Sequence, residues 1–256
     1  MRDIKFAAGV WFLGATGDRF VKAGYREDKT MEERFKLAAS IDGISGLEMH
    51  YPTEVTDELL QAMGEQDKVV PYLDLPLQHA SRSILKAMRR PSKTEHLEGL
   101  IARLRAAVPD ISIRTAFIMG FPGETEEDSE QLLDFCRAME FDHVGLFVYS
   151  AEEGSPAADL PDQVPPDVQR ERYERLAETV EAISERKIAR RVGSDTEVLI
   201  DGDSDVFPDF WRGRHPGQAP DVDGVVYVPR AAASPGQIIP CRLTASQGYD
   251  LFTESI

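Results

Sequence analysis

Apolar and polar residues follow two different patterns along the chain, and the change of pattern divides it into two parts. Up to about residue 192, short apolar runs typical of strands alternate with segments in which apolar residues recur at helical spacing. After residue 195 only short apolar runs remain, over residues 196–200, 224–228 and 238–243, separated by Gly, Pro and Asp turns. The first pattern predicts parallel strands covered by helices, and the second predicts a small β-barrel.

Five strands and five covering helices are predicted in the first part. The candidate strands are residues 4–12, 46–50, 69–75, 111–119 and 144–149, and the candidate helices are residues 31–40, 56–63, 81–88, 94–108 and 126–139. A closed barrel of this class needs eight parallel strands. We therefore expect an α/β fold with a partial parallel (βα) barrel of about five strands.

A long charged helix, predicted over residues 167–191, connects the two parts. Its apolar residues fall on one face, and Gly193 ends it because glycine readily adopts the left-handed cap conformation. We predict three successive units: a βαβ segment over 1–50, the rest of the partial barrel with the linker helix over 51–192, and a small all-β, OB-like barrel over 193–256.

The distribution of charge supports the first boundary and limits the partners. The formal net charge is −16, yet the first 50 residues are balanced, with 8 basic and 8 acidic residues. This charge disfavours binding that depends on neutralising phosphates, so nucleic acid is a less favoured partner than a basic protein. We see neither a secretory leader nor an apolar run that could cross a membrane, and we expect a cytoplasmic protein.

The cysteine content bears on redox and metal chemistry. Cys136 and Cys241 are the only two cysteines, and they lie 105 residues apart. This spacing excludes a disulfide scaffold and does not supply a thiolate cage, so no metal site is predicted. Cys136 lies in a predicted helix, where we expect a buried, inert thiol.

Polar residues and glycines follow two of the predicted strands at the positions where parallel sheets gather ligands. Gln78 and His79 follow the third strand, and Gly120-Phe-Pro-Gly123 follows the fourth. Glycines allow the backbone to approach a ligand closely. We therefore expect both motifs at one edge of the sheet.

Simpler interpretations of these residues remain open. The glycine motif could form only a tight turn, with Glu124 and Thr125 beginning the next helix through capping and the helix dipole. His79 could be a loop histidine bonded to backbone rather than a base. The acidic run Glu126–Asp128 is interpreted as a solvated first helical turn.

Three long strings of residues carry a family resemblance. They are Val70-Pro-Tyr-Leu-Asp-Leu-Pro-Leu-Gln-His-Ala-Ser81, Arg114-Thr-Ala-Phe-Ile-Met-Gly-Phe-Pro-Gly-Glu-Thr125 and the terminal Tyr249-Asp-Leu-Phe252. With their surroundings over 51–256 they resemble the radical-SAM methylthiotransferases, and among these the RimO branch, which ends in a TRAM domain. The resemblance implies a transferase that methylthiolates an aspartate of a basic ribosomal protein of the small subunit.

The same resemblance implies the cofactors. It implies S-adenosylmethionine, with contacts from Gln78, Arg114, Phe117, Gly120 and Glu124, and 4Fe-4S clusters, while no catalytic residue is assigned. Members of the family hold the first cluster with three cysteines in a C-x3-C-x2-C loop. The two cysteines of this chain do not form that motif. We therefore do not expect the chain by itself to be active.

The first 50 residues resemble a different family. The segments Ile4–Phe12 and Gly46–Pro52 are similar to the opening of a xylose-isomerase-like sugar isomerase barrel, which indicates a fusion near residue 50. Other interpretations are a non-catalytic protein- or RNA-binding module, a relative of the tRNA methylthiotransferases, and a sugar isomerase fragment.

Overall fold

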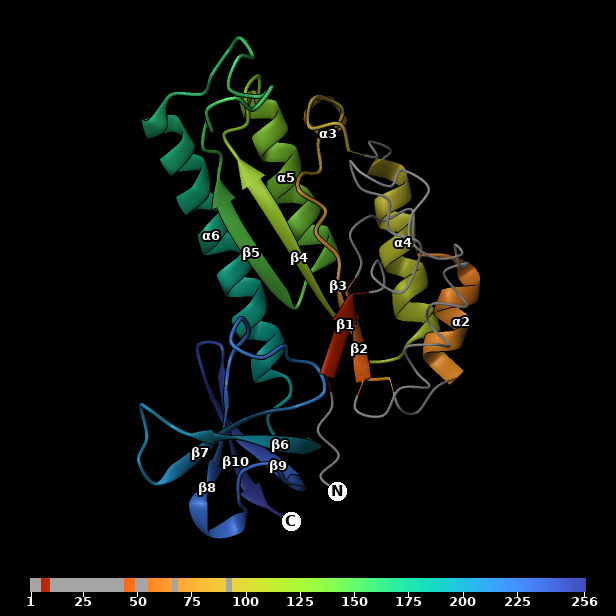
Figure 1. Cartoon of the computed structure of the whole chain (residues 1–256), viewed down its shortest axis with the longest axis vertical. Helices are drawn as coiled ribbons and strands as arrows, with labels where there is room; N and C mark the ends of the chain where they lie inside the picture. The colour runs from red at the N-terminus through yellow and green to blue at the C-terminus, as the bar shows by residue number, and fades with distance from the viewer. Residues whose placement is uncertain (1–5, 10–43, 49–54, 66–68, 91–93) are drawn as a thin grey trace, which may run out of the picture.

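The described part of the chain forms a parallel sheet with covering helices and a small barrel (Figure 1). The computed structural model describes residues 6–9, 44–48, 55–65, 69–90 and 94–256. The helix predicted over 31–40 lies outside these residues. So do the outer parts of the first two predicted strands.

The sheet contains five described strands in the order of the sequence, and each pairs in parallel with the next. They are β1 (Phe6–Gly9), β2 (Ile44–Glu48), β3 (Tyr72–Asp74), β4 (Ser112–Met119) and β5 (His143–Val148). This arrangement confirms the predicted α/β class and the parallel sheet. Strand β3 begins later than predicted because Pro71, which has no N–H to donate, precedes it.

Helices cover one face of this sheet. The described helices are α2 (Asp57–Glu65), α3 (Arg82–Ala87), α4 (Thr94–Ala107), α5 (Glu126–Met139) and α6 (Pro166–Ala189). Helices α5 and α6 pack against each other beside β4 and β5, while α2 packs against α4. The two-residue period of β4 decides which side chains meet them. Ile113, Phe117 and Met119 are buried, whereas Arg114 and Ala116 face the side of the sheet that no described helix covers.

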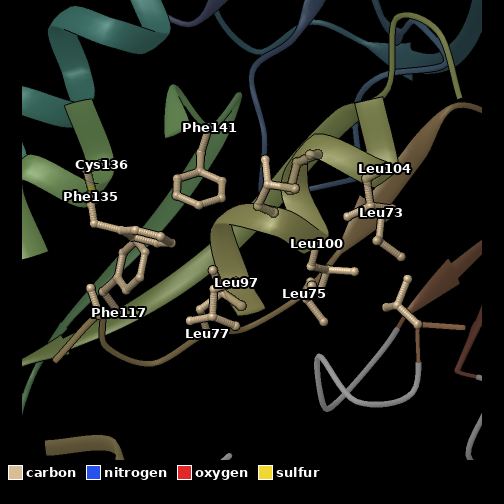
Figure 2. Packing of buried hydrophobic residues seen from close by; sticks show 14 of the residues in the cluster. Leu73, Leu75, Leu77, Leu97, Leu100, Leu104, Phe117, Phe135, Cys136 and Phe141 are labelled. Carbon is tan, nitrogen blue, oxygen red and sulfur yellow. The ribbon is translucent and has the colours of Figure 1, made fainter. Parts of the chain in front are cut away.

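The core lies between β4 and the helices. Figure 2 shows leucines of β3 and α4 beside an aromatic group formed by Phe117, Phe135 and Phe141. Phe117 meets Phe135 and Phe141 edge to face, with ring centroids 6.4 and 5.9 Å apart. Cys136 is buried in the same core, as expected of an inert thiol.

Helix α6 runs from the sheet to the barrel (Figure 1). It starts with Pro166 in its first turn, where a missing N–H has no cost, and it ends at Ala189 rather than near 191. Gly193 has a φ of 90° and donates its N–H to the carbonyl of Leu243 at 2.7 Å. The predicted glycine therefore turns the chain directly into the barrel.

The barrel is closed by five strands in the order β10-β8-β7-β6-β9. They are β6 (Asp195–Asp203), β7 (Phe210–Arg214), β8 (Val226–Pro229), β9 (Ile238–Gln247) and β10 (Asp250–Ser255), with the 3-10 turn η3 (Arg230–Ala232) between β8 and β9. Apolar residues at alternating positions fill its interior, including Val198, Ile200 and Leu251. No helix in the described part of the chain is long and apolar enough to span a membrane.

Candidate functional site

The two motifs predicted to share an edge of the sheet are hydrogen-bonded to each other. The N–H of Gln78 donates to the carbonyl of Ala116 at 2.8 Å, and the N–H of Ile118 donates to the carbonyl of Gln78 at 2.9 Å. Gln78 adopts a φ of 72°, which turns the chain after this pairing. We call the segments 76–81 and 120–124 the carboxyl rim, because they follow the carboxyl ends of β3 and β4.

Glu124 folds back beneath the turn that begins at Gly120. Its carboxyl group is fully buried, and Oε2 accepts the N–H of Gly120 at 2.8 Å. The N–H of Glu124 donates to the carbonyl of Phe121 at 2.9 Å, which closes the turn. Helix α5 is capped instead by Thr125. Glu124 therefore stabilises the turn rather than the start of the helix.

Two residues of α6 hold the same turn from outside. Arg172 Nη1 donates to Oε1 of Glu124 at 2.9 Å and to its carbonyl oxygen at 3.0 Å. Gln169 Nε2 donates to the carbonyl of Gly120 at 3.0 Å. An added Cβ on Gly120 would lie 2.4 Å from Cγ of Gln169, so the helix lies directly against the turn. The sequence did not assign either residue to the site.

His79 joins the rim from the other side. Its Nδ1 accepts the N–H of Ser81 at 2.9 Å, so the interpretation as a backbone-bonded histidine is confirmed. In the neutral ring the proton then lies on Nε2, which faces Oε2 of Glu124 at 3.5 Å without a well-formed hydrogen bond. The imidazole is fully buried. A fully buried imidazole in the rim suits a structural role better than exchange of protons with a substrate.

The interpretation of Asp128 as a solvated acid is wrong. Its carboxylate accepts hydrogen bonds from Thr125, in a capping box, and from the hydroxyl groups of Ser81 and Ser83. Burial alone would raise the pKa of this carboxyl, but these hydrogen bonds outweigh it and lower the pKa to about 2. Asp128 therefore ties the segment after β3 to the start of α5.

On the face of the sheet that no described helix covers, one large apolar side chain lies near the rim. Phe147 of β5 is 57% exposed and lies beside the half-buried Ile118 of β4, whereas Val148 is paired with Met119 and points to the opposite face. The side chain of Phe117 points into the core, so only its backbone reaches the rim. A flat heterocycle such as adenine fits an apolar surface of this kind.

Arg114 lies away from the rim, near the amino end of β4. Gly120 follows six positions later, roughly 20 Å along a strand. The guanidinium donates to Oδ1 of Asp223 at 2.7 Å and lies 3.4 Å from Oδ2 of Asp74. Burial lowers its pKa, but the charges of Asp223 and Asp74 outweigh burial and raise it. Of the five predicted cofactor contacts, Gln78, Gly120 and Glu124 lie in the rim, Phe117 meets it only through its backbone, and Arg114 lies elsewhere.

Asp223 is the centre of this second cluster, which joins the barrel to the sheet. Its carboxylate is 1% exposed and accepts hydrogen bonds from the hydroxyl of Tyr72 at 2.9 Å and from the N–H of Ala219 at 2.7 Å. His143 Nδ1 lies 3.5 Å away. Burial and the charge of Asp223 raise the pKa of Tyr72, which keeps the phenol protonated as a donor.

The residues of the chain do not fit an iron–sulfur cluster. Cys136 on α5 and Cys241 on β9 are buried in separate cores, and burial raises the pKa of Cys136 to about 12. Such a thiol stays protonated, whereas cluster ligation needs thiolates. Among the residues that the structure describes, no group of three or more His, Cys, Asp or Glu is placed to hold a metal ion.

The chain is similar to known proteins over most of its length. Residues 9–136 match the family model of the Radical SAM superfamily, a range that crosses residue 50, and residues 192–256 match the TRAM domain. A curated relative from Geobacter sulfurreducens, "Ribosomal protein uS12 methylthiotransferase RimO", is 43% identical over 89% of this chain and 51% of its own length. The protein of the same name from Thermosynechococcus vestitus is 48% identical over 79% of this chain and 45% of its own length.

The chain thus spans about half the length of the curated relatives that it matches. Among solved structures, coproporphyrinogen III oxidase (HemN) from Escherichia coli, described as a radical SAM enzyme, is 16% identical with a TM-score of 0.45. The match covers 73% of this chain and 50% of the HemN chain.

Proposed function

Because the chain belongs to the radical SAM superfamily, and within it to the RimO-type methylthiotransferases, we propose that it contributes the cofactor rim and the substrate-docking barrel of an enzyme that methylthiolates ribosomal protein uS12. The substrate is the one named for its relatives. The observation that carries the proposal is a single chain in which a radical SAM sheet, a linker helix and a TRAM barrel follow one another. A ribosomal substrate supports a cytoplasmic location for this activity.

S-adenosylmethionine is the proposed cofactor of the rim, where it would supply the methyl group of the transfer. The backbone of Gln78 and of Phe117–Gly120 would border its adenosine, with Phe147 as an apolar support. Glu124 would act through the turn that it holds and not by direct contact. Arg114 is left out of this proposed contact set because its guanidinium is engaged by Asp223. Since a thiolate-held cluster does not fit this chain, we assign no reaction step to its residues.

The barrel is proposed to dock a basic protein. Residues 195–256 contain 10 acidic and 4 basic residues. All four arginines of this segment form ion pairs within the barrel: Arg212 with Asp221, Arg214 with Asp201, Arg230 with Asp203 and Arg242 with Asp195. These pairs neutralise the cations that phosphates would need, while an acidic excess remains to attract a basic partner.

Two details refine this docking surface. Arg212 and Arg214 do not form a local basic patch, because each faces an aspartate at 3.6 and 2.6 Å. Asp223 is buried in the contact with the sheet and does not contribute to the surface charge that a partner meets. The exposed acids Asp205 and Asp209 remain on the loop between β6 and β7.

Titration of the whole chain against uS12 and against a tRNA pool, at several salt concentrations, tests the proposed partner. We expect uS12 to bind more tightly at physiological salt and its affinity to fall as salt rises. Tighter binding of tRNA would contradict the proposal and favour a tRNA-modifying relative. Reversing Asp205 and Asp209 to lysine should weaken uS12 binding, and Glu130→Lys on α5 is the matched control for the change of charge.

We also propose that the functional units are residues 1–50, 51–192 and 193–256. The separate apolar cores of the sheet and the barrel support the second boundary. The radical SAM match crosses the first boundary, so residues 1–50 would complete the same sheet whatever their origin.

A further inference from the structure

A buried ion pair connects helix α6 to the carboxyl rim. The side chains of Glu124 and Arg172 are 0% and 7% exposed, and they meet at 2.9 Å. Removing two charges from water carries a large desolvation cost, which good geometry and further hydrogen bonds must offset. Here the further bonds go to the backbone of Gly120 and Glu124, the two ends of the turn.

The position of Arg172 on its helix is unusual. It lies on the buried stripe of α6 that continues through Leu176, Val180 and Ile183. An apolar residue at this position would continue the stripe without a desolvation cost. The arginine is instead directed at the one carboxylate that holds the N–H of Gly120.

Gln169 adds a second contact one turn earlier. Its amide donates to the carbonyl of Gly120, so α6 fixes the carbonyl of that residue while Glu124 fixes its N–H. With a φ of 74°, Gly120 has the freedom of a residue without Cβ, and the turn needs outside contacts to adopt one conformation.

We propose that Arg172 and Gln169 are positioning residues: they act through Glu124 and Gly120 to hold the turn in the conformation that receives the adenosine of the cofactor. This inference rests on the proposed cofactor rim. It also connects that rim to the barrel, because Leu176 and Val180 of α6 pack in the core of the sheet while Ile188 packs in the core of the barrel.

Four forms of the whole chain test the inference: wild type, Arg172→Met, the double variant Arg172→Met/Glu124→Gln, and Arg175→Met. Arg172→Met leaves the carboxylate of Glu124 buried without its partner, so its loss of stability is expected. The double variant removes both charges, and glutamine can still accept the N–H of Gly120. Arg175 lies on α6 like Arg172, but its ion pairs with Glu126 and Glu130 of α5 are more exposed, so Arg175→Met is the matched control.

Amide hydrogen exchange of residues 120–124 is the first measurement, and it needs no ligand. We expect the double variant to recover the unfolding temperature of the wild type while exchange in this segment stays about tenfold faster. Arg175→Met should leave exchange unchanged. If exchange returns to the wild-type rate together with stability, Arg172 has only a structural role and the inference is wrong.

Affinity for S-adenosylhomocysteine is the second measurement. We expect the dissociation constant of the double variant to be about tenfold higher than that of the wild type, with no change in Arg175→Met. Equal affinities of wild type and double variant would overturn the inference. If the wild type does not bind the ligand at all, the proposed cofactor rim fails, and the exchange rates alone decide whether α6 positions the turn.

Discussion

Two buried carboxylates occupy opposite ends of strand β4, and each meets an arginine from a distant part of the chain. At the carboxyl end, Glu124 meets Arg172 of α6. At the amino end, Asp223 of the barrel meets Arg114 of the strand itself. The chemistry is the same, but the first pair holds a turn within the sheet domain and the second holds two domains together.

The difference lies in what surrounds each pair. Arg172 is 7% exposed and its partner 0%, whereas Arg114 is 17% exposed beside a carboxylate that also receives the hydroxyl of Tyr72. If the pair with Arg114 is broken, the hydroxyl of Tyr72 still donates to Asp223, and the partly exposed guanidinium of Arg114 can contact water. At Glu124 the environment offers less relief, so the cost of breaking the pair should be larger.

Glu124→Ala should therefore have the largest effect on folding. It removes the buried carboxylate partner of Arg172, which keeps only a 3.4 Å contact with the exposed Glu126, and it removes the acceptor of the N–H of Gly120. Together these losses should cost about 3–5 kcal/mol. Urea denaturation monitored by circular dichroism measures this. Glu130→Ala, at an exposed ion pair of α5, should cost less than about 1 kcal/mol. Similar losses in both variants would contradict the structural role of Glu124.

Asp223→Ala should cost less, about 2–3 kcal/mol, because Arg114 and Tyr72 regain some contact with water. Unlike the loss at Glu124, this one should separate the barrel from the sheet, which a two-step thermal transition would reveal. Asp221→Ala, two residues away and exposed, should leave a single transition. A single unchanged transition in Asp223→Ala would mean that the domains do not depend on this contact.

Two glycines of the turn give a sharper comparison within the rim. Both have positive φ, 74° for Gly120 and 83° for Gly123, so alanine is strained at either site by about 1 kcal/mol. Only at Gly120 would the new Cβ meet a side chain, that of Gln169. We expect Gly120→Ala to cost about 2 kcal/mol and Gly123→Ala about 1 kcal/mol. Equal unfolding free energies would show that α6 does not press on the turn.

The smallest expected effect is the pH dependence from Asp128. Its pKa in the folded chain, about 2, lies below the ordinary value of 3.8, so its stabilisation is present above pH 4 and is lost as the pH falls from about 4 to 2. After allowance for solvent screening this amounts to about 1 kcal/mol. The difference in unfolding free energy between wild type and Asp128→Asn should shrink over this pH range. A constant difference would contradict the lowered pKa.

The sequence predicted most of the sheet and only part of the barrel, for a physical reason. Helix α5 begins and ends at the predicted residues because its capping box and apolar face are local. Strand β7, with the sequence Phe-Trp-Arg-Gly-Arg, was missed because it contains no apolar run of the kind that marked its neighbours, and β10 was missed likewise. Closure of the barrel, which no local pattern encodes, makes these segments strands.

The residues of the candidate site, too, could be predicted only where a local sequence pattern marks them. The rim motifs could be predicted because strand ends meet at one edge of a parallel sheet. The role of Arg172 could have been suspected from a charge on the apolar stripe of its helix. The role of Asp223 could not be predicted in this way. Its partner Arg114 is 109 residues away in the sequence, and Asp223 looks like any other aspartate in a turn of the barrel.

Amide chemical shifts distinguish the carboxyl rim from the cluster at Arg114 as the site that receives the adenosine ligand. The labelled chain is titrated with S-adenosylhomocysteine, whose binding should be weak without cluster ligation. We predict saturable shifts at Gln78 and at residues 118–124, and none at Arg114, His143 or Asp223. Shifts confined to the Arg114–Asp223 cluster, or no shifts at the rim, would mean that the rim is not the cofactor site.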